Sequence, residues 1–123
     1  MRSKYGARKV EIDGMTFDSR KEARYYLFLR EAERKGEISD LRMQVPYELI
    51  PAIHENVTVH LKTKDKVVER CVQKAVHYIA DFVYYDNNTG KEEVVDVKGI
   101  RTEGYKLKKK MMLAFKGIAI TEV

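Results

Sequence analysis

Hydrophobic and polar positions change period several times along the chain, and these changes predict a mixture of strands and helices. Residues 9–12 and 15–17 are short apolar-containing runs on either side of Asp13-Gly14, a dipeptide that accepts the positive φ angles of a hairpin turn. Over 19–35 the apolar residues recur at helical spacing, and Gly36 is suited to end the helix. The expected buried stripe of this helix is Tyr25, Phe28, Leu29 and Ala32.

The middle of the chain predicts extended structure with one additional hairpin. After a turn at 38–40, residues 44–51 read as a strand, and Pro46 indicates an edge or an irregularity because proline cannot donate to a neighbouring strand. Within 52–74, apolar and polar positions alternate around a polar turn, which is typical of a half-exposed hairpin. We expect this hairpin to be an insertion in the core fold.

Two more strands and a second helix complete the pattern. Residues 75–85 are almost wholly apolar and aromatic, as expected of a strand buried on both faces, and a polar turn leads back into a strand at 92–98. A helix capped by Thr102 should run to about residue 115, before a last strand at 118–123. Its expected apolar side is Leu107, Met111, Ala114 and Phe115. The order is β-hairpin, α, β strands, α, β, which defines an α/β fold.

Length and cysteine content limit the architecture and the compartment. A chain of 123 residues has the size of one domain, so we expect a single domain over 1–123 with a mobile basic arm at 1–8. The single cysteine, Cys71, has no internal disulfide partner, and the three histidines lack the spacing of a structural zinc site. No apolar run approaches the roughly 20 residues that span a bilayer. We therefore expect a cytoplasmic protein without membrane association.

Positive charge is concentrated near the end of the chain. The net charge is +5, and residues 99–123 contribute +4 of it, with six lysines and arginines against Glu103 and Glu122. Such a segment suits a polyanionic backbone, although charge alone equally fits a solvated helix face. The candidate DNA contacts, including the N-terminal arm, are Arg2, Lys4, Arg8, Lys9, Arg101, Lys106, Lys109 and Lys110. Lys106, Lys109 and Lys110 are expected on one helix face, away from Leu107 and Met111.

Two acidic residues, Asp81 and Asp96, occupy otherwise apolar predicted strands. A carboxylate there is unfavourable without a partner, so the pair indicates a cation. Lys98 follows Asp96 by two positions, and strand alternation places the two side chains on one face, roughly 7 Å apart along the strand. Glu22, at the edge of the first helix's stripe, is expected to turn partly inward.

Each of these residues also has a purely structural interpretation. Ser19 and Glu22 fit a capping box, in which the glutamate bonds back to the start of its own helix. Asp81 fits a strand terminus or a pair with a nearby lysine, and Asp96 with Lys98 fits a surface cross-strand pair. Only their ordered combination favours a shared site.

That combination resembles the PD-(D/E)XK nuclease superfamily, and more narrowly small phage-encoded endonucleases related to Holliday-junction resolvases. The resemblance covers nearly the whole chain, and its motifs are Ser3-Lys4-Tyr5-Gly6, Phe17-Asp18-Ser19-Arg20-Lys21-Glu22-Ala23, Tyr78-Ile79-Ala80-Asp81-Phe82 and Asp96-Val97-Lys98-Gly99. Ala80 stands where the motif has proline, which is not a ligand. The resemblance implies a restriction-endonuclease-like core, with a mixed β-sheet flanked by helices.

The resemblance also implies a metal-dependent reaction. Asp81, Asp96 and the backbone carbonyl of Val97 would bind Mg²⁺, for which Mn²⁺ would substitute, and Glu22 would complete the site directly or through water. Lys98 would orient or deprotonate the attacking water, or stabilise the phosphate. The implied assembly is a homodimer acting on branched DNA, in the host cell cytoplasm if phage-encoded. The alternatives are a general or single-strand-specific phage nuclease in replication, recombination or packaging, and a non-catalytic DNA-binding accessory protein.

Overall fold

A hairpin opens the part of the chain described by the computed structural model, residues 9–123. Strands β1 (Val10–Ile12) and β2 (Met15–Phe17) pair antiparallel. The connecting residues Asp13 and Gly14 both have positive φ angles, 53° and 78°. The hairpin predicted from this dipeptide is therefore confirmed.

Helix α1 (Arg20–Arg34) begins and ends where the sequence predicts, but it buries a different face. The Ser19 side chain caps it by accepting from the Glu22 backbone N–H, and Gly36 follows it with φ 79°. Leu29 is only 1 % exposed, whereas Phe28, placed in the predicted stripe, is 63 % exposed. The buried apolar face is Ala23, Tyr26, Leu29 and Ala32. The prediction for Phe28 is wrong because the hairpin and the sheet contact the neighbouring face of the helix.

The central sheet is mixed and has four strands in the order β3-β6-β7-β8. Its strands are β3 (Ile38–Ile50), β6 (Val76–Asp86), β7 (Lys91–Asp96) and β8 (Thr121–Glu122). The first three are antiparallel neighbours, and β8 runs parallel to β7. The predicted α/β class with a mixed sheet is confirmed at this level.

Strand β3 lies at an edge of this sheet, where Pro46 needs no partner for its nitrogen. The turn predicted at 38–40 is wrong, because the strand already begins at Ile38. Its pairing with β6 is irregular there, and Asp40 takes a positive φ of 55°. A polar residue in a bulge resembles a turn when the sequence is read alone.

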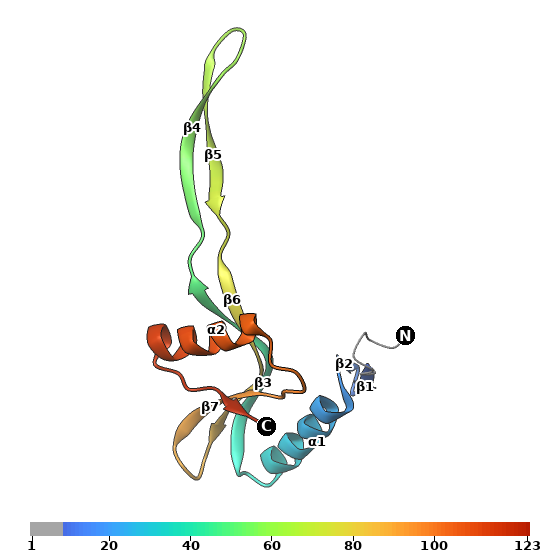
Figure 1. Cartoon of the computed structure of the whole chain (residues 1–123). Helices are drawn as coiled ribbons and strands as arrows, with labels where there is room; N and C mark the ends of the chain where they lie inside the picture. Colours follow the sequence, from blue (N-terminus) through green and yellow to red (C-terminus); the bar gives the residue numbers. More distant parts are fainter. Residues whose placement is uncertain (1–8) are drawn as a thin grey trace.

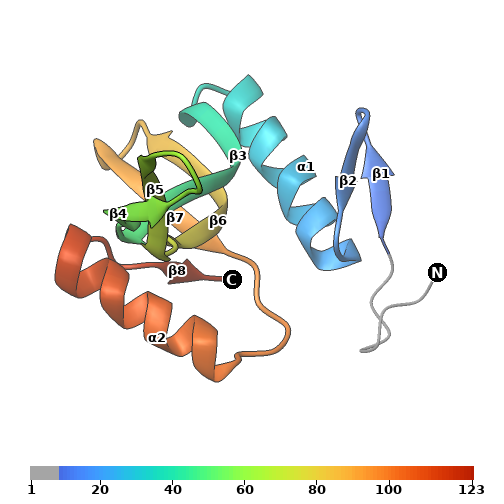
Figure 2. The same cartoon turned by 90° about the horizontal axis from the view of Figure 1, so that it is seen from above.

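Two apolar clusters lie on opposite sides of the sheet, one with α1 and one with α2 (Figure 2). Phe82 and Val95 pack with α1, while Tyr78, Ala80 and Val83 pack with α2. The prediction that β6 is buried on both faces holds only for its central part. Its first half leaves Ile79 53 % exposed, because neither helix reaches that part of the face.

Helix α2 (Glu103–Met111) is capped by the Thr102 side chain and continues as the π-helix η1 (Met112–Lys116). Tyr105 and Met112 pack against the sheet. Leu107 and Phe115 are about 60 % exposed, at 59 % and 61 %, so the predicted apolar side is wrong at these positions, and Ala114 is exposed as well. Tyr105 contributes to the buried side of the helix instead, because its ring packs against the sheet while its hydroxyl group donates to Glu122.

Strands β4 (Ile53–His60) and β5 (Asp65–Gln73) form a two-stranded ribbon that projects far from the rest of the fold (Figure 1). This confirms a hairpin within 52–74, although it is more exposed than the predicted half-buried pattern. Among residues 9–123, no helix is long and apolar enough to cross a membrane.

The orientation of α1 can be tested with two neighbouring residues. Leu29→Ala should lower the free energy of unfolding by about 2–5 kcal/mol, because it opens a cavity in the core. Phe28→Ala should change it by less than about 0.5 kcal/mol, because its side chain is largely solvated. Urea denaturation of both variants measures the difference, and equal losses would show that α1 packs through another face.

Candidate functional site

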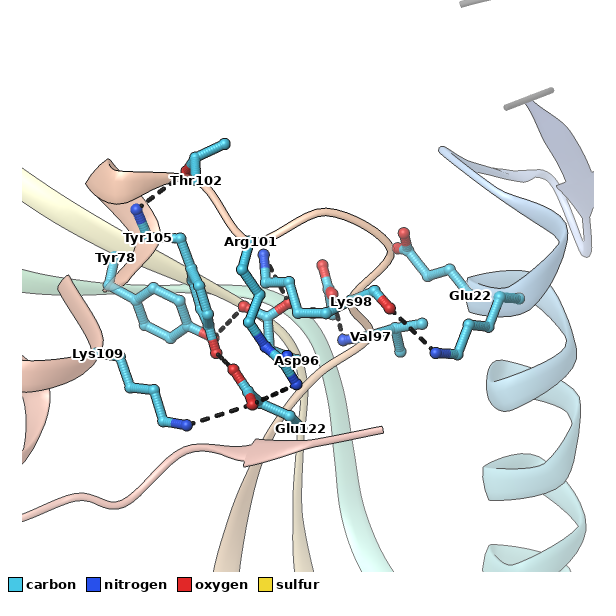
Figure 3. A network of polar contacts seen from close by, with 12 residues as sticks. Glu22, Tyr78, Asp96, Val97, Lys98, Arg101, Thr102, Tyr105, Lys109 and Glu122 are labelled. Atoms are coloured by element: carbon cyan, nitrogen blue, oxygen red, sulfur yellow. Dashed lines mark hydrogen bonds and ion pairs between the residues drawn. The ribbon is translucent and has the colours of Figure 1, made fainter. Parts of the chain in front are cut away.

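Two buried carboxylates stand out in the described structure. Among residues 9–123, Glu22 and Asp96 are the only buried polar or charged side chains, with 6 % and 2 % exposure. Asp96 is the last residue of β7, and Asp81 lies in the neighbouring strand β6. Figure 3 shows Glu22 extending from α1 toward the chain segment that carries Asp96 and Lys98. The residues predicted for one site therefore approach each other from three elements.

Each aspartate has one oxygen atom held by a short hydrogen bond, and its other oxygen atom has a longer contact in Asp81 and an ion pair in Asp96. Asp81 Oδ2 accepts from the backbone N–H of Val97 at 2.8 Å, and Asp96 Oδ2 accepts from the Tyr78 hydroxyl group at 2.6 Å. Asp96 Oδ1 is buried without a hydrogen bond, and the Lys98 ammonium group lies 3.0 Å from it as a charge partner. The burial of this oxygen atom is thus compensated by a cation, the Lys98 ammonium group.

Gln44 connects two of the acids, and the sequence analysis did not identify it. Its side-chain Nε2 donates to Glu22 Oε1 at 3.2 Å and has a longer contact of 3.4 Å with Asp81 Oδ1. Gln44 has a positive φ of 52°, so the β3 backbone is distorted where the side chain meets the acids. In the sequence, the only indication was a polar residue two positions before Pro46. The direction of the Gln44 side chain depends on the backbone distortion, which the sequence does not reveal.

The acids raise one another's pKa values. Burial is the largest cause that raises the pKa of Glu22 from 4.5 to about 7, and the charges of Asp81, Asp18 and Asp96 raise it further. Burial also raises the pKa of Asp81, although the hydrogen bond from Val97 opposes the shift. Without a cation, the folded protein therefore resists ionising all of these groups together.

Lys98 reaches Asp96 from a loop. The prediction that both side chains share one strand face is wrong in its reason, because β7 ends at Asp96 and strand alternation does not explain their contact. The ammonium group of Lys98 also lies 4.0 Å from the centre of the Tyr105 ring. Its backbone carbonyl accepts from Lys21 Nζ at 3.0 Å, which links the loop to the start of α1.

Another acid, Glu122 of β8, contacts the basic side chains next to the site (Figure 3). It accepts from the Tyr105 hydroxyl group at 2.7 Å and pairs with Arg101 at 3.0 Å and Lys109 at 3.3 Å. The hydrogen bond from Tyr105 and then the two cations hold the pKa of Glu122 at about 2. Two of the predicted DNA contacts are thus partly neutralised.

The predicted basic face of α2 borders an open hollow of about 710 Å³. Arg101, Lys106, Lys109 and Lys110 all line it, and Lys106 pairs with Glu103 at 3.2 Å. Leu107 and Leu113 line the same hollow, so the prediction that the lysines face away from Leu107 is wrong. Of the predicted N-terminal contacts, Lys9 is exposed, and Arg2, Lys4 and Arg8 lie outside the described residues.

A small, oxygen-binding cation fits this arrangement better with two carboxylates than with three. Within residues 9–123, no group of three or more His, Cys, Asp or Glu side chains is arranged to hold one metal ion. Asp81 Oδ1 has only a long contact with Gln44, and Asp96 Oδ1 would be offered in exchange for its ion pair with Lys98. Mg²⁺ accepts one or two carboxylates with water in its remaining positions. For Glu22, this geometry favours the water-mediated role.

The described fold and site define a mixed α/β protein with a cluster of carboxylates and a lysine at the end of a strand pair. The chain belongs to the family DUF1064, a protein family of unknown function, whose model matches residues 2–121. Neither a curated protein nor a solved structure matches the chain.

Glu22 should make the stability of the metal-free protein depend on pH. Its pKa is higher when folded, about 7, than the ordinary 4.5, so the folded state binds more protons between these values. The stabilisation is therefore complete below pH 4.5 and is lost as the pH rises through 7. We expect a loss of up to about 3 kcal/mol of unfolding free energy across this interval.

Urea denaturation in a chelator at several pH values measures this dependence. Glu22→Gln should remove the part of the decline around pH 7, leaving the part due to Asp81, whose pKa is about 6. Glu37→Gln, which changes an exposed carboxylate after α1, should retain the full profile. An unchanged profile in Glu22→Gln would show that another group is responsible.

The hydrogen bond from Tyr78 to Asp96 should contribute measurably to stability. Tyr78→Phe removes a buried donor to a buried carboxylate, so we expect a loss of about 1–3 kcal/mol in the free energy of unfolding. Tyr85→Phe is the matched control, because Tyr85 lies on the same strand and is 42 % exposed. Equal stability of the two variants would exclude a strong contribution from this bond.

Proposed function

We propose that this protein is a metal-dependent DNA endonuclease with a restriction-endonuclease-like core. The observation that carries the proposal is the buried Asp96 Oδ1, which has no hydrogen bond and lies beside Lys98. Asp81 and Glu22 adjoin it, and burial and mutual repulsion raise their pKa values. A buried group of acids with raised pKa values, whose partners compensate them only in part, is typical of a site that binds a cation and performs chemistry.

Each of these residues would have its own role in phosphodiester hydrolysis. Asp81, Asp96 and the carbonyl of Val97 would hold Mg²⁺ or Mn²⁺, which stabilises charge on a phosphate and makes bound water more acidic. Gln44 keeps Glu22 oriented toward the same place, where its carboxylate can accept a hydrogen bond from water. Lys98 supplies a positive charge that can meet a phosphate oxygen or orient the attacking water.

The proposed substrate is branched DNA, cleaved to leave a 5′-phosphate and a 3′-hydroxyl group. The hollow lined by Arg101, Lys106, Lys109 and Lys110 supports contact with a phosphate backbone beside the acids. These contacts bind phosphates regardless of sequence, which favours recognition of DNA shape. A homodimer would provide two such sites for paired cuts across a four-way junction.

Cleavage of labelled DNA tests the proposal. With Mg²⁺, the wild-type protein should cut a four-way junction, and Asp96→Asn should cut it at least about 100-fold more slowly, because a carboxylate ligand is lost. Glu48→Gln is the control, because it changes an exposed carboxylate of the same sheet. Equal cleavage by wild type and Asp96→Asn, or no cleavage by either, would contradict the proposal.

Parallel reactions with a flap and with plain duplex separate a junction-selective enzyme from a general nuclease. Metal binding has its own readout, because Mg²⁺ should raise the Tm of the wild-type protein above pH 7 but not that of Asp81→Asn. A non-catalytic DNA-binding protein would bind the junction without cutting it and without this metal-dependent rise.

A further inference from the structure

The ribbon formed by β4 and β5 contributes nothing to the candidate site, and it projects far from both helices (Figure 1). Nearly all its residues are exposed, and only Val57 and Val68, which face each other, are partly covered. An isolated two-stranded ribbon is at best marginally stable in water. A long, solvated ribbon therefore suggests contact with something outside this chain.

Lysines gather at the end of the ribbon, with one acid, Asp65, among them. Each of its three acids has a partner within the ribbon: Glu55 pairs with Arg70, Glu69 with His54 at 3.3 Å, and Asp65 with His60 at 2.8 Å. The end of the ribbon carries Lys62, Lys64 and Lys66, which we call the ribbon tip. All three are exposed, and none forms an ion pair with the part of the chain that the structure describes.

A polyanion fits the ribbon tip better than a second copy of the protein does. Strand alternation places Val57, Val59, Val68 and Val72 on one face of the ribbon. Four valines supply far less than the roughly 800 Å² that each partner buries in a stable dimer. Three closely spaced lysines match the spacing of charge along DNA, and the major groove of a duplex admits a two-stranded ribbon.

We propose that the ribbon tip binds the phosphate backbone of duplex DNA at a distance from the candidate active site. Fifteen residues separate Lys66 from Asp81 along extended chain, which corresponds to about 50 Å, or about 15 base pairs of duplex. The inference rests on the proposed function only in taking DNA as the ligand. The ribbon tip holds one duplex arm of the substrate at a distance from the candidate active site.

Binding measurements in a chelator test this inference without cleavage. Fluorescence anisotropy compares labelled duplexes of about 10 and about 30 base pairs, because only the longer one reaches from the candidate active site to the tip. The combined variant Lys62→Ala, Lys64→Ala and Lys66→Ala should lose about tenfold or more in affinity for the longer duplex. For this variant, the slope of log K against log salt concentration should be less negative than that of the wild type by about 2–3.

The matched control is the combined variant Lys35→Ala, Lys91→Ala and Lys116→Ala, which lowers the net charge from +5 to +2 as the tip variant does. It should keep the preference for the longer duplex. Equal losses in the two variants would overturn the inference, because general charge would then explain binding. A change of oligomeric state in the tip variant, measured by light scattering, would overturn it in favour of contact between copies.

Failure of this inference is distinguishable from failure of the proposed function. Tip-dependent binding without cleavage by any preparation would support the ribbon contact and reject the nuclease. Cleavage with unchanged binding in the tip variant would do the reverse.

Discussion

The buried carboxylate of Asp96 is the constraint on which the rest of the site depends. Removing such a charge from water is costly unless partners compensate it, and here they come from separate elements. Tyr78 of β6 donates to one oxygen atom, and the Lys98 ammonium group lies beside the other. Tyr105 of α2 contacts Lys98 with its ring and donates to Glu122, which is the neighbour of Asp96 in β8. The last helix and strand are thus fixed by the same interactions that satisfy one acid.

The burial of acidic side chains lowers the stability of the fold. A protein that needed only stability would replace Glu22 and Asp81 with apolar residues, because their burial raises their pKa values and disfavours the ionised forms. Gln44 and the Val97 backbone N–H relieve this only in part. In the proposed function, a bound cation would offset the remaining repulsion between the acids.

Local rules account for the parts of the fold that the sequence predicted well. The turn at Asp13-Gly14 and the ends of α1 depend on residues close in the chain, and they were found correctly. The exposure of Phe28 and Leu107 depends on which neighbours pack against each helix, which periodicity does not specify. Of the site, Asp81 and Asp96 were placed correctly on adjacent strands, but Gln44 was missed because a backbone distortion directs its side chain.

The motif Asp96-Val97-Lys98 brings the two charged side chains together, but not because they share a strand face. Strand alternation would have placed the side chain of Lys98 beside that of Asp96, but Lys98 lies in the loop after β7. Its place is defined instead by the Tyr105 ring at 4.0 Å and by the hydrogen bond between its backbone and Lys21. Because the ammonium group is 3.0 Å from the one Asp96 oxygen atom without a hydrogen bond, it already neutralises the position that a cation would take. For the proposed phosphodiester hydrolysis, a lysine suits this arrangement better than an arginine does, because a compact charge on a flexible stem could shift toward a phosphate without leaving the site.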